Sequence, residues 1–508
     1  MVGGTVSLTP AALLSAHDWT LEANDSRVAE LLARDHRFLI GGDLVGSDSG
    51  RTFEVISPYS EEVIARVPDG TRADANRAVD AAMQAFPGWA GLTATARADA
   101  VRVLADAVSA RARDLALLDA IDGGAPIAMV TADVAASVAA LRYFAGLALE
   151  SKGHTIPASG NLHFTERQPY GVVAKIIPFN HPIMFAVSKI AAPLVAGNTV
   201  VLKPAEATPL SALLLAEICH DVLPPGVVNI VVGDGIDVPD ALVRHPDVYR
   251  VGFIGSEAAG LAIQRAAAEV AVKTVTLELG GKNALIAFPD ADIDEVALAA
   301  VQGMNFGWSG QSCGSTSRLL VHESIADPVL EQIARIVADR EYRSPLDPAA
   351  VQGTMVNREQ YDRVLDYIEA ARTEGARVVT GGAPPDNAER GLFIAPTVLD
   401  DVKPEHRVAN EEIFGPVLSV LRWRDETEAI SLANRVRYGL TGSVFTNDIR
   451  RAHRVARALH TGFVWINAAG PHFLGVPYGG WKNSGIGQEE ALEELLSYSQ
   501  VKSVTVKL

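Results

Sequence analysis

Cysteine is almost missing from this chain of 508 residues, in which only Cys219 and Cys313 occur. So few cysteines differ from the paired usage of secreted, disulfide-stabilised domains and are typical of a reducing compartment. The two form no Cys-x-x-Cys pair, and the twelve histidines are scattered without a spacing such as His-Glu-x-x-His. We therefore expect no metal site, and each cysteine has to be interpreted separately.

Positive charge is also scarce. Lysine and arginine number 44 against 61 acidic residues, a net charge of −17, so no broad basic surface is available to bind a nucleic acid.

Long hydrophobic segments are lacking as well. Residues 1–16 have no basic region ahead of their short apolar stretch, and we expect the apolar runs elsewhere to be too brief to cross a bilayer. These features predict a cytoplasmic protein with neither a nucleic-acid nor a membrane partner.

What the chain does have is apolar residues, 48% of the total, with 21% charged and 6% aromatic residues. That balance is typical of a globular protein with a large core, and the length suggests about three domains. Residues 37–68 alternate short apolar runs with turn residues, which predicts antiparallel hairpins. Residues 72–150 are rich in alanine with apolar positions at helical spacing, whereas residues 154–168 are polar and predict a protruding assembly arm.

From Gly171 to Leu277, strand-like runs alternate with helix-like ones, a pattern that predicts a parallel, doubly wound sheet. Ligands bind such sheets at the carboxyl ends of the strands, which carry Asn180, Lys203 and Ser256. A second strand–helix series over residues 286–446 predicts a separate α/β domain. The tail, residues 497–508, alternates like a strand and is expected to pair beside the arm.

Cys313 is surrounded by glycines at positions 307, 310 and 314. Glycines let the backbone approach a substrate closely, so this packaging favours a nucleophilic thiol. Cys219 lies inside an amphipathic helical segment and is interpreted as a small buried hydrophobe.

Glu278 is the single acid at the end of an apolar strand. Burial there would raise the pKa of its carboxyl towards that of a general base. The same carboxylate would also serve as a structural acceptor for backbone amides near Gly280 and Gly281, and the residues alone leave both interpretations open.

Three segments occur in order: Glu-Leu-Gly-Gly-Lys at Glu278–Lys282, Gly-Gln-Ser-Cys at Gly310–Cys313 and Glu-Glu-Ile-Phe-Gly-Pro at Glu411–Pro416. Together they resemble the NAD(P)-dependent aldehyde dehydrogenase superfamily, and the resemblance extends from about Phe38 to the C-terminus. It implies an α/β fold with two doubly wound domains and a small β oligomerisation arm. The implied ranges are residues 1–150 and 170–281 for cofactor binding, 282–483 for catalysis, and 151–169 with 484–508 for the arm.

The resemblance implies a role for each catalytic residue. Cys313 would attack an aldehyde to give a thiohemiacetal, and Asn180 would stabilise the oxyanion. After hydride transfer, Glu278 would activate the water that hydrolyses the thioester. Lys189 and Glu489 match positions implicated in proton relay, but they are equally interpretable as surface or helix-end charges.

The resemblance also implies a dinucleotide site. Lys203 and Glu206 would hold the adenosine ribose, and a carboxylate there favours NAD, with NADP possible. Ile254 stands where the family usually has threonine, and Gly255–Ser256 alone would be an ordinary helix cap. The other implied cofactor residues are Ile177, Pro178, Phe179, Gly235, Phe253, Gly255, Ser256, Leu279, Glu412 and Phe414.

The substrate tunnel is expected to be aromatic and to lack arginine, which favours an aromatic or medium-chain, apolar aldehyde. Its implied lining is His181, Phe185, Trp308, Ser312, Phe473 and Tyr478, each of which is also open to interpretation as core packing. Many relatives have arginine at the place of Gln488 and some have glutamate at that of Gln500; if those two family residues pair across a subunit contact, the expected homodimer or homotetramer would be less sensitive to salt. Two alternatives are a CoA-acylating or semialdehyde-specific dehydrogenase, and a catalytically silent structural relative.

Overall fold

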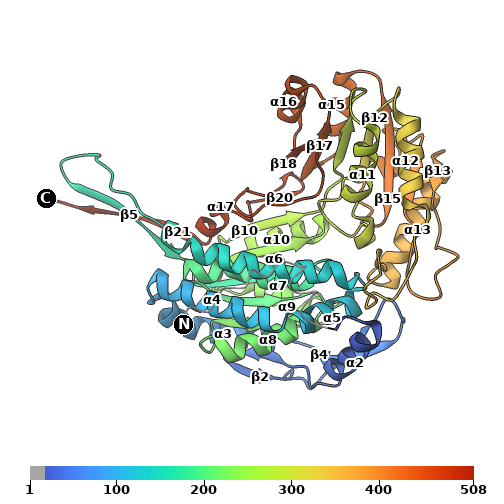
Figure 1. Cartoon of the computed structure of the whole chain (residues 1–508). Coiled ribbons are helices and arrows are strands. Elements are labelled where there is room, and N and C mark those ends of the chain that lie inside the picture. Colours follow the sequence, from blue (N-terminus) through green and yellow to red (C-terminus); the bar gives the residue numbers. More distant parts are fainter. Residues whose placement is uncertain (1–17) are drawn as a thin grey trace, which may run out of the picture.

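The computed structural model describes residues 18–508 and has two α/β parts with a narrow arm that projects from one of them (Figure 1). Residues 1–17, which include the short N-terminal apolar stretch considered above, lie outside the described residues.

The first part is built on an eight-stranded sheet with the order β2-β1-β8-β7-β6-β9-β10-β20. Its central strands β6 to β10 run parallel, as the strand–helix alternation predicted, and antiparallel strands close both edges. The strands are β1 (Phe38–Ile40), β2 (Asp43–Val45), β6 (Val172–Ile176), β7 (Thr199–Lys203), β8 (Val228–Ile230), β9 (Val248–Gly255), β10 (Thr274–Leu279) and β20 (Gly485–Ile486).

Helices cover both faces of this sheet, because its central strands are apolar on both sides. One face packs against α3 (Arg72–Ala90), α9 (Asp237–Arg244) and α10 (Glu257–Ala268). The other packs against α7 (Pro182–Ala196) and α8 (Leu210–Val222). A further helical layer lies outside α7 and α8 and comprises α4 (Ala94–Ala110), α5 (Ala112–Gly123), α6 (Ile127–Gly146) and η1 (Ala148–Glu150), with α2 (Leu21–Leu32) against α5.

Helix α6 corrects one expectation. Among the described residues it is long and apolar enough, by length and composition, to cross a membrane, and 61% of its most apolar window is buried inside the protein. The sequence reading that every apolar run is too short was therefore wrong here. Packing against α4, α5 and α7 accounts for the apolar composition of this helix.

The second part is built on a seven-stranded sheet with the order β13-β14-β15-β12-β11-β17-β18. Its strands are β11 (Ala284–Ala287), β12 (Arg318–His322), β13 (Arg377–Thr380), β14 (Thr397–Asp400), β15 (Val417–Trp423), β17 (Thr441–Phe445) and β18 (Phe463–Ile466). Apolar clusters lie on both of its faces. The helices are α11 (Ile293–Gly303), η2 (Phe306–Trp308), α12 (Ala326–Ala338), α13 (Arg358–Thr373), α14 (Arg407–Asn410), α15 (Glu426–Asn434) and α16 (Ile449–Ala458).

The projecting arm consists of β5 (Leu162–Pro169) and β21 (Ser499–Val506), paired antiparallel over their whole length. The tail thus pairs with the early hairpin, as its alternation predicted. The range 484–508 predicted for the arm is too wide, because β20 pairs with β10 in the first sheet and α17 (Leu492–Ser497) packs against α7. The remaining small sheets are the predicted hairpin β3 (Thr52–Ile56) with β4 (Val63–Pro68), and β16 (Tyr438–Gly439) with β19 (Trp481–Lys482).

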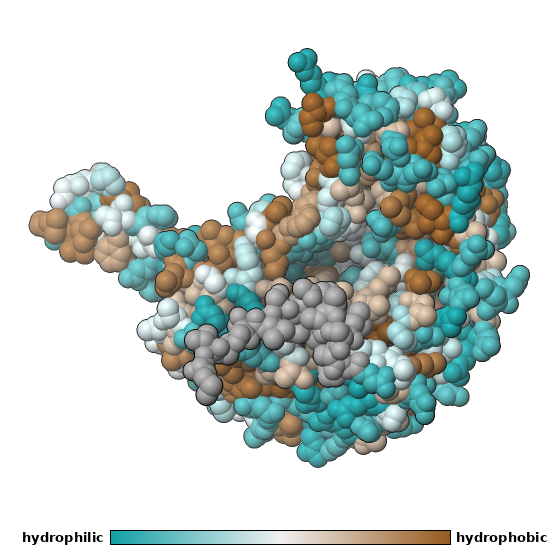
Figure 2. All heavy atoms as spheres, in the orientation of Figure 1, coloured by the Kyte–Doolittle hydropathy of each residue, from teal (hydrophilic) through white to brown (hydrophobic). Residues whose placement is uncertain are grey.

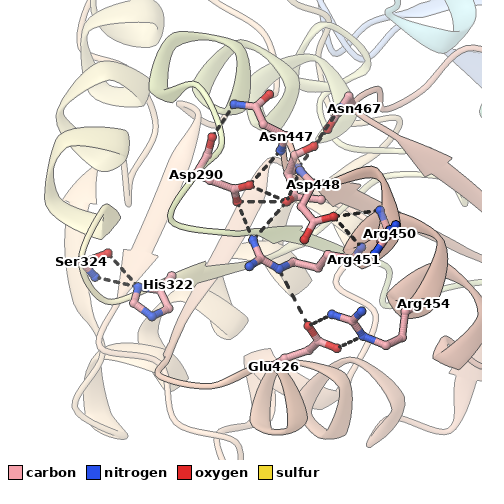
Figure 3. A network of polar contacts seen from close by, with 11 residues as sticks. Asp290, His322, Ser324, Glu426, Asn447, Asp448, Arg450, Arg451, Arg454 and Asn467 are labelled. Carbon is pink, nitrogen blue, oxygen red and sulfur yellow. Dashed lines mark hydrogen bonds and ion pairs between the residues drawn. The ribbon is translucent and has the colours of Figure 1, made fainter.

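A polar network fastens α16 to the second sheet (Figure 3). The Asp290 carboxylate accepts hydrogen bonds from Thr446 Oγ1 at 2.9 Å and from Arg451 Nη1 at 2.9 Å. The neighbouring Arg454 forms two hydrogen bonds with Glu426 on α15. Asp290 therefore joins the loop after β11 to the loop after β17.

Replacing Asp290 by alanine leaves these donors without their acceptor, so we expect the second part to lose about 1–3 kcal/mol of stability. Urea unfolding followed by tryptophan fluorescence measures the loss. The control is Asp294→Ala, which removes an exposed acid on nearby α11. Equal unfolding midpoints for the two variants would show that the network contributes nothing specific.

Candidate active site

A cavity of about 450 Å³ lies beside the ends of α6, α7 and β10. Figure 2 shows that the surface between the two α/β parts is hollowed. The cavity is lined by apolar side chains and by a group of ionisable ones. Its lining residues are Ala136, Ala140, Phe144, His181, Met184, Phe185, Ser188, Lys189, Glu278, Asn305, Ser312, Cys313, Gly314, Gly470, His472, Leu474, Tyr478, Glu489, Glu490 and Glu494.

Cys313 lies on a tight loop between η2 and β12. The loop turns through left-handed backbone conformations at Ser309 and Gly310, with φ of 51° and 68°. Asn283 fixes the loop, because its Nδ2 donates to the Cys313 carbonyl at 2.7 Å and its Oδ1 accepts from the Thr441 amide at 3.0 Å. The thiol is thereby held on the cavity wall.

Glu278 faces this thiol from the end of β10. Its side chain is buried, and in residues 18–508 no hydrogen bond reaches its Oε1. Burial, reinforced by the nearby Glu489 carboxylate, raises the pKa of Glu278 to about 8. Burial and the Glu278 carboxyl together raise the pKa of the Cys313 thiol well above its ordinary value. A buried carboxyl with a raised pKa, one unbonded oxygen and a thiol as its hydrogen-bond partner suits a general base better than a structural cap.

An ion pair lies behind Glu278. Lys189 Nζ is 2.7 Å from Glu489 Oε2, and both side chains are largely buried. Burial alone would lower the pKa of Lys189, but Glu489, Glu494 and Glu490 offset it and the net pKa lies above the usual value. Likewise, burial would raise the pKa of Glu489, but Lys189 and Lys175 hold it below normal. These charges are therefore paired inside the site, and the surface or helix-end interpretation does not describe them.

The loop after α14 brings Glu412 and Phe414 to the first sheet. Glu412 Oε1 accepts from the Gly281 amide at 2.9 Å, and burial raises the pKa of its carboxyl to about 7. Phe414 has a left-handed backbone, with φ of 57°, and its ring meets Phe179 edge to face at 5.8 Å between centroids. Of the two adjacent acids only Glu412 reaches Gly281, whereas Glu411 bonds to Tyr367 and Arg407.

The other predicted cofactor residues follow the strand ends of the first sheet. Lys203 Nζ lies 2.9 Å from Glu206 Oε2, and the Glu206 side chain is 51% exposed, so its carboxylate is free to accept further hydrogen bonds. Ser256 Oγ accepts from the Ala259 amide and caps α10, which is the ordinary reading of Gly255–Ser256. Ile177, Pro178 and Phe179 follow β6, Phe253 lies within β9, Leu279 ends β10, and Gly235 has a positive φ of 106°.

Three of the predicted catalytic and substrate-pocket residues do not line the large cavity. Asn180 and Trp308 border a smaller adjoining cavity, together with Gln311. Trp308 packs against the His181 ring at 4.3 Å between centroids, so it supports the wall from behind. Phe473 is 58% exposed and its neighbours His472 and Leu474 line the cavity in its place, which corrects the prediction by one residue.

Several residues that line the cavity were not predicted from the sequence, among them His472, Glu490 and Glu494. Asp133, which pairs with His181, was missed as well. The one available signal was spacing: Asp133, Ala136 and Ala140 recur on one face of α6. His472 and Glu490 lie in irregular segments where no periodicity marks the inward side. The described residues contain no group of three or more His, Cys, Asp or Glu side chains placed to hold a metal ion.

Comparison with known proteins gives one consistent result. Residues 44–504 match the model of the aldehyde dehydrogenase family. The chain is 46% identical over 473 residues to aldehyde dehydrogenase tropH of Talaromyces stipitatus, which covers 91% of each sequence. It is 40% identical over 478 residues to retinaldehyde dehydrogenase 3 of Mus musculus, 93% of each. The NAD+ complex of an aldehyde dehydrogenase from Bacillus cereus superposes with a TM-score of 0.92 at 39% identity, over 95% of this chain and 98% of that one.

Gly310 is a test of the loop geometry, because a Cβ there would overlap the Gly415 carbonyl and φ is +68°. Gly50 has nearly the same φ, +66°, but open space around it. We expect Gly50→Ala to cost about 1–2 kcal/mol for the left-handed backbone alone. Gly310→Ala adds the clash and should cost clearly more in urea unfolding, with a changed rate of Cys313 alkylation. Equal costs would mean that the loops around Cys313 and Glu412 are not in close contact.

Proposed function

Since the chain belongs to the aldehyde dehydrogenase family and is an NAD(P)-dependent aldehyde dehydrogenase, we propose that it oxidises an aromatic or medium-chain aldehyde to the carboxylic acid through a thioester on Cys313. The observation that carries this proposal is the pairing of the Cys313 thiol with the buried Glu278 carboxyl on the wall of one cavity.

The residues of the first sheet fit a dinucleotide. Glu206 presents a half-exposed carboxylate beside buried Lys203 at the end of β7, which suits ribose hydroxyls and disfavours a 2′-phosphate. Glu412 and Phe414 approach the same edge of the sheet from the second part and would hold the nicotinamide ribose and ring. When bound, NAD supplies the acceptor for the hydride that leaves the substrate carbon.

The protein's own groups perform the remaining steps. The Cys313 thiol passes its proton to Glu278, and the thiolate sulfur bonds to the aldehyde carbon. The oxygen becomes an alkoxide, which the Asn180 amide and the Cys313 backbone N–H would stabilise. Once the thioester has formed, Glu278 releases the first proton to solvent and its carboxylate takes a proton from water, so that the hydroxide attacks the acyl carbon and the thiolate leaves with release of the acid.

The substrate preference rests on the cavity wall. Ala136, Ala140, Phe144, Met184 and Phe185 present apolar surface, and the small alanines of α6 leave room for a ring or a chain. No arginine is among the lining residues. This wall supports an aromatic or medium-chain aldehyde over a strongly anionic one, and hence over a semialdehyde that carries a carboxylate.

The projecting arm supports assembly as a homodimer or homotetramer. Leu162, Val501 and Val506 are exposed on its two strands, and Figure 2 shows hydrophobic residues gathered along it. Exposed apolar side chains on a two-stranded ribbon are typical of a surface that another subunit covers.

Cys313→Ser should lower NADH formation roughly 10³-fold or more, because an alcohol neither ionises as readily nor leaves as a thiolate does. NAD binding, followed by fluorescence titration, should hardly change. Cys219→Ser is the matched control and should keep its activity, since Cys219 is buried in α8. Dehydrogenase turnover at the wild-type rate in Cys313→Ser would overturn the proposal.

The pKa of Glu278 sets an expected pH profile. Because burial raises that pKa to about 8, only a minority of the carboxyl is ionised at pH 7 and the rate of thioester hydrolysis should rise as the pH increases through about 8. Glu278→Gln should abolish that rise and accumulate acyl-enzyme, visible as a burst of NADH and as an added mass on Cys313. A profile in Glu278→Gln that matches the wild type would assign the base elsewhere.

A further inference from the structure

One histidine on the wall of the active-site cavity is held in a fixed orientation by a carboxylate. His181 Nδ1 lies 2.7 Å from Asp133 Oδ2, and both side chains are nearly buried, at 13% and 11% exposure. His181 stands just before α7, and Asp133 lies on α6. The pair therefore spans the two helices that form one side of the cavity.

The contact with Asp133 determines whether the second ring nitrogen of His181, Nε2, donates or accepts a hydrogen bond. The Asp133 oxygen accepts the hydrogen bond, so Nδ1 carries the hydrogen, and in the imidazole tautomer that this contact selects Nε2 is an acceptor. Among the described residues none forms a hydrogen bond with His181 Nε2. The ring itself cannot turn freely, because Trp308 packs against it at 4.3 Å and Phe185 meets it edge-on at 5.7 Å between centroids.

A second histidine offers a comparison within the same cavity. His472 Nδ1 is 3.1 Å from Glu490 Oε1, the same arrangement, but the His472 side chain is 34% exposed at the cavity mouth. The His181 side chain is less exposed than that of His472, at 13% against 34%, so we expect water to compete less for its ring nitrogen and a substrate that donates to it to be favoured more. His181 is therefore the acceptor that can discriminate between substrates.

The charges around the cavity restrict the group that His181 can recognise. The carboxyls of Glu278, Glu489, Glu490 and Glu494 line the cavity with a single lysine, Lys189, which is already paired with Glu489, so no unpaired lysine or arginine among the lining residues is available to hold a carboxylate or phosphate of the substrate. For a cationic group, Glu489 is already paired with Lys189 and Glu490 with His472. The oxygens without a partner among the described residues belong to Glu278 and Glu494, and burial raises the pKa of both carboxyls, which disfavours the charged form that a cation needs. A hydroxyl is neutral and donates the hydrogen that Nε2 lacks.

We propose that His181, oriented by Asp133, is a specificity-determining residue that selects aldehydes bearing a hydroxyl group on the body of the molecule. The hydroxyl donates to His181 Nε2 while the aldehyde carbon lies at Cys313, and the apolar wall packs against the remainder. This inference rests on the proposed function and names the substrate class of the same site. Asp133 acts through His181 and is a positioning residue.

The test compares substrates that differ in one hydrogen-bond donor. The kcat/KM values for 3- and 4-(hydroxymethyl)benzaldehyde are divided by those for the corresponding methyl ethers, which have similar shape but donate nothing. The alcohols do not ionise near neutral pH, so charge does not change. For the wild type we expect a ratio of about ten or more for at least one isomer, the value of one satisfied hydrogen bond of roughly 1.4 kcal/mol.

Three variants of cavity residues and one surface control locate the effect. His181→Phe should bring the ratio close to one, and Asp133→Asn should lower it, since the amide no longer imposes the tautomer. His472→Phe should change it less. His220→Phe removes a histidine whose Nδ1 bonds to the Gly42 carbonyl on the surface of α8, and it should leave activity and ratio unchanged. A merely structural role for His181 would lower both rates together and leave the ratio intact.

The outcomes separate this inference from the proposed function. Oxidation of benzaldehyde or hexanal supports the proposed function regardless of the hydroxyl. A wild-type ratio near one, or a ratio that survives in His181→Phe, overturns the inference alone. So does a clear preference for 4-(trimethylammoniomethyl)benzaldehyde or 4-carboxybenzaldehyde, which would assign the cavity to a charged substrate. If no aldehyde of the panel is oxidised, both proposals fail.

Discussion

Burial of the Glu278 carboxyl at the end of β10 is the constraint on which the rest of the site depends. A carboxyl in this position loses its hydration, and its pKa rises to about 8 because little compensates for that loss. The protein places the second carboxylate, Glu489, close by, but binds it to Lys189. Without the lysine, two buried anions would oppose each other, and removing one partner of such a pair is strongly destabilising. The two charges of the ion pair act on the pKa of Glu278 in opposite directions, since Glu489 raises it and Lys189 lowers it. The carboxyl of Glu278 can therefore be buried and still accept a proton.

The same requirement explains why the two α/β parts meet through glycines. Glu278 lies on the first sheet and Cys313 precedes β12 of the second, so the chemistry exists only where the two sheets end side by side. A side chain at Gly280 would overlap the Glu412 carboxylate, and one at Gly310 would overlap the Gly415 carbonyl. Gly280 therefore permits the close contact between the two parts, whereas Gly310 lets two loops of the second part, which carry Cys313 and Glu412, pack against each other.

Local pattern predicted the regular elements well. The parallel strands β6 to β10, the helices α3 to α6 and the pairing of β21 with β5 follow from periodicity and strand–helix alternation, because each buries a repeating apolar face. Motifs identified Cys313, Glu278 and Glu412.

The residues of the cavity wall were harder to predict from the sequence. Phe473 was predicted to line the cavity, but its neighbours His472 and Leu474 do, because an irregular loop has no periodicity that marks its inner side. The Asp133–His181 contact joins residues 48 positions apart, and no local signal reports such a pair. The apolar composition of α6 was likewise not recognised as that of a core helix.

The acidic residues that line the cavity affect the substrate and the product of the proposed reaction differently. The substrate aldehyde is neutral, whereas the product is a carboxylate formed in a cavity whose single lysine, Lys189, is already paired with Glu489. Because no unpaired lysine or arginine among the lining residues offsets the new charge, we expect the product to be bound less tightly than the substrate. An arginine in the lining would reverse this preference and retain the acid. The absence of arginine from the cavity wall, which first indicated an apolar aldehyde, thus also favours release of the product and, through it, completion of each turnover.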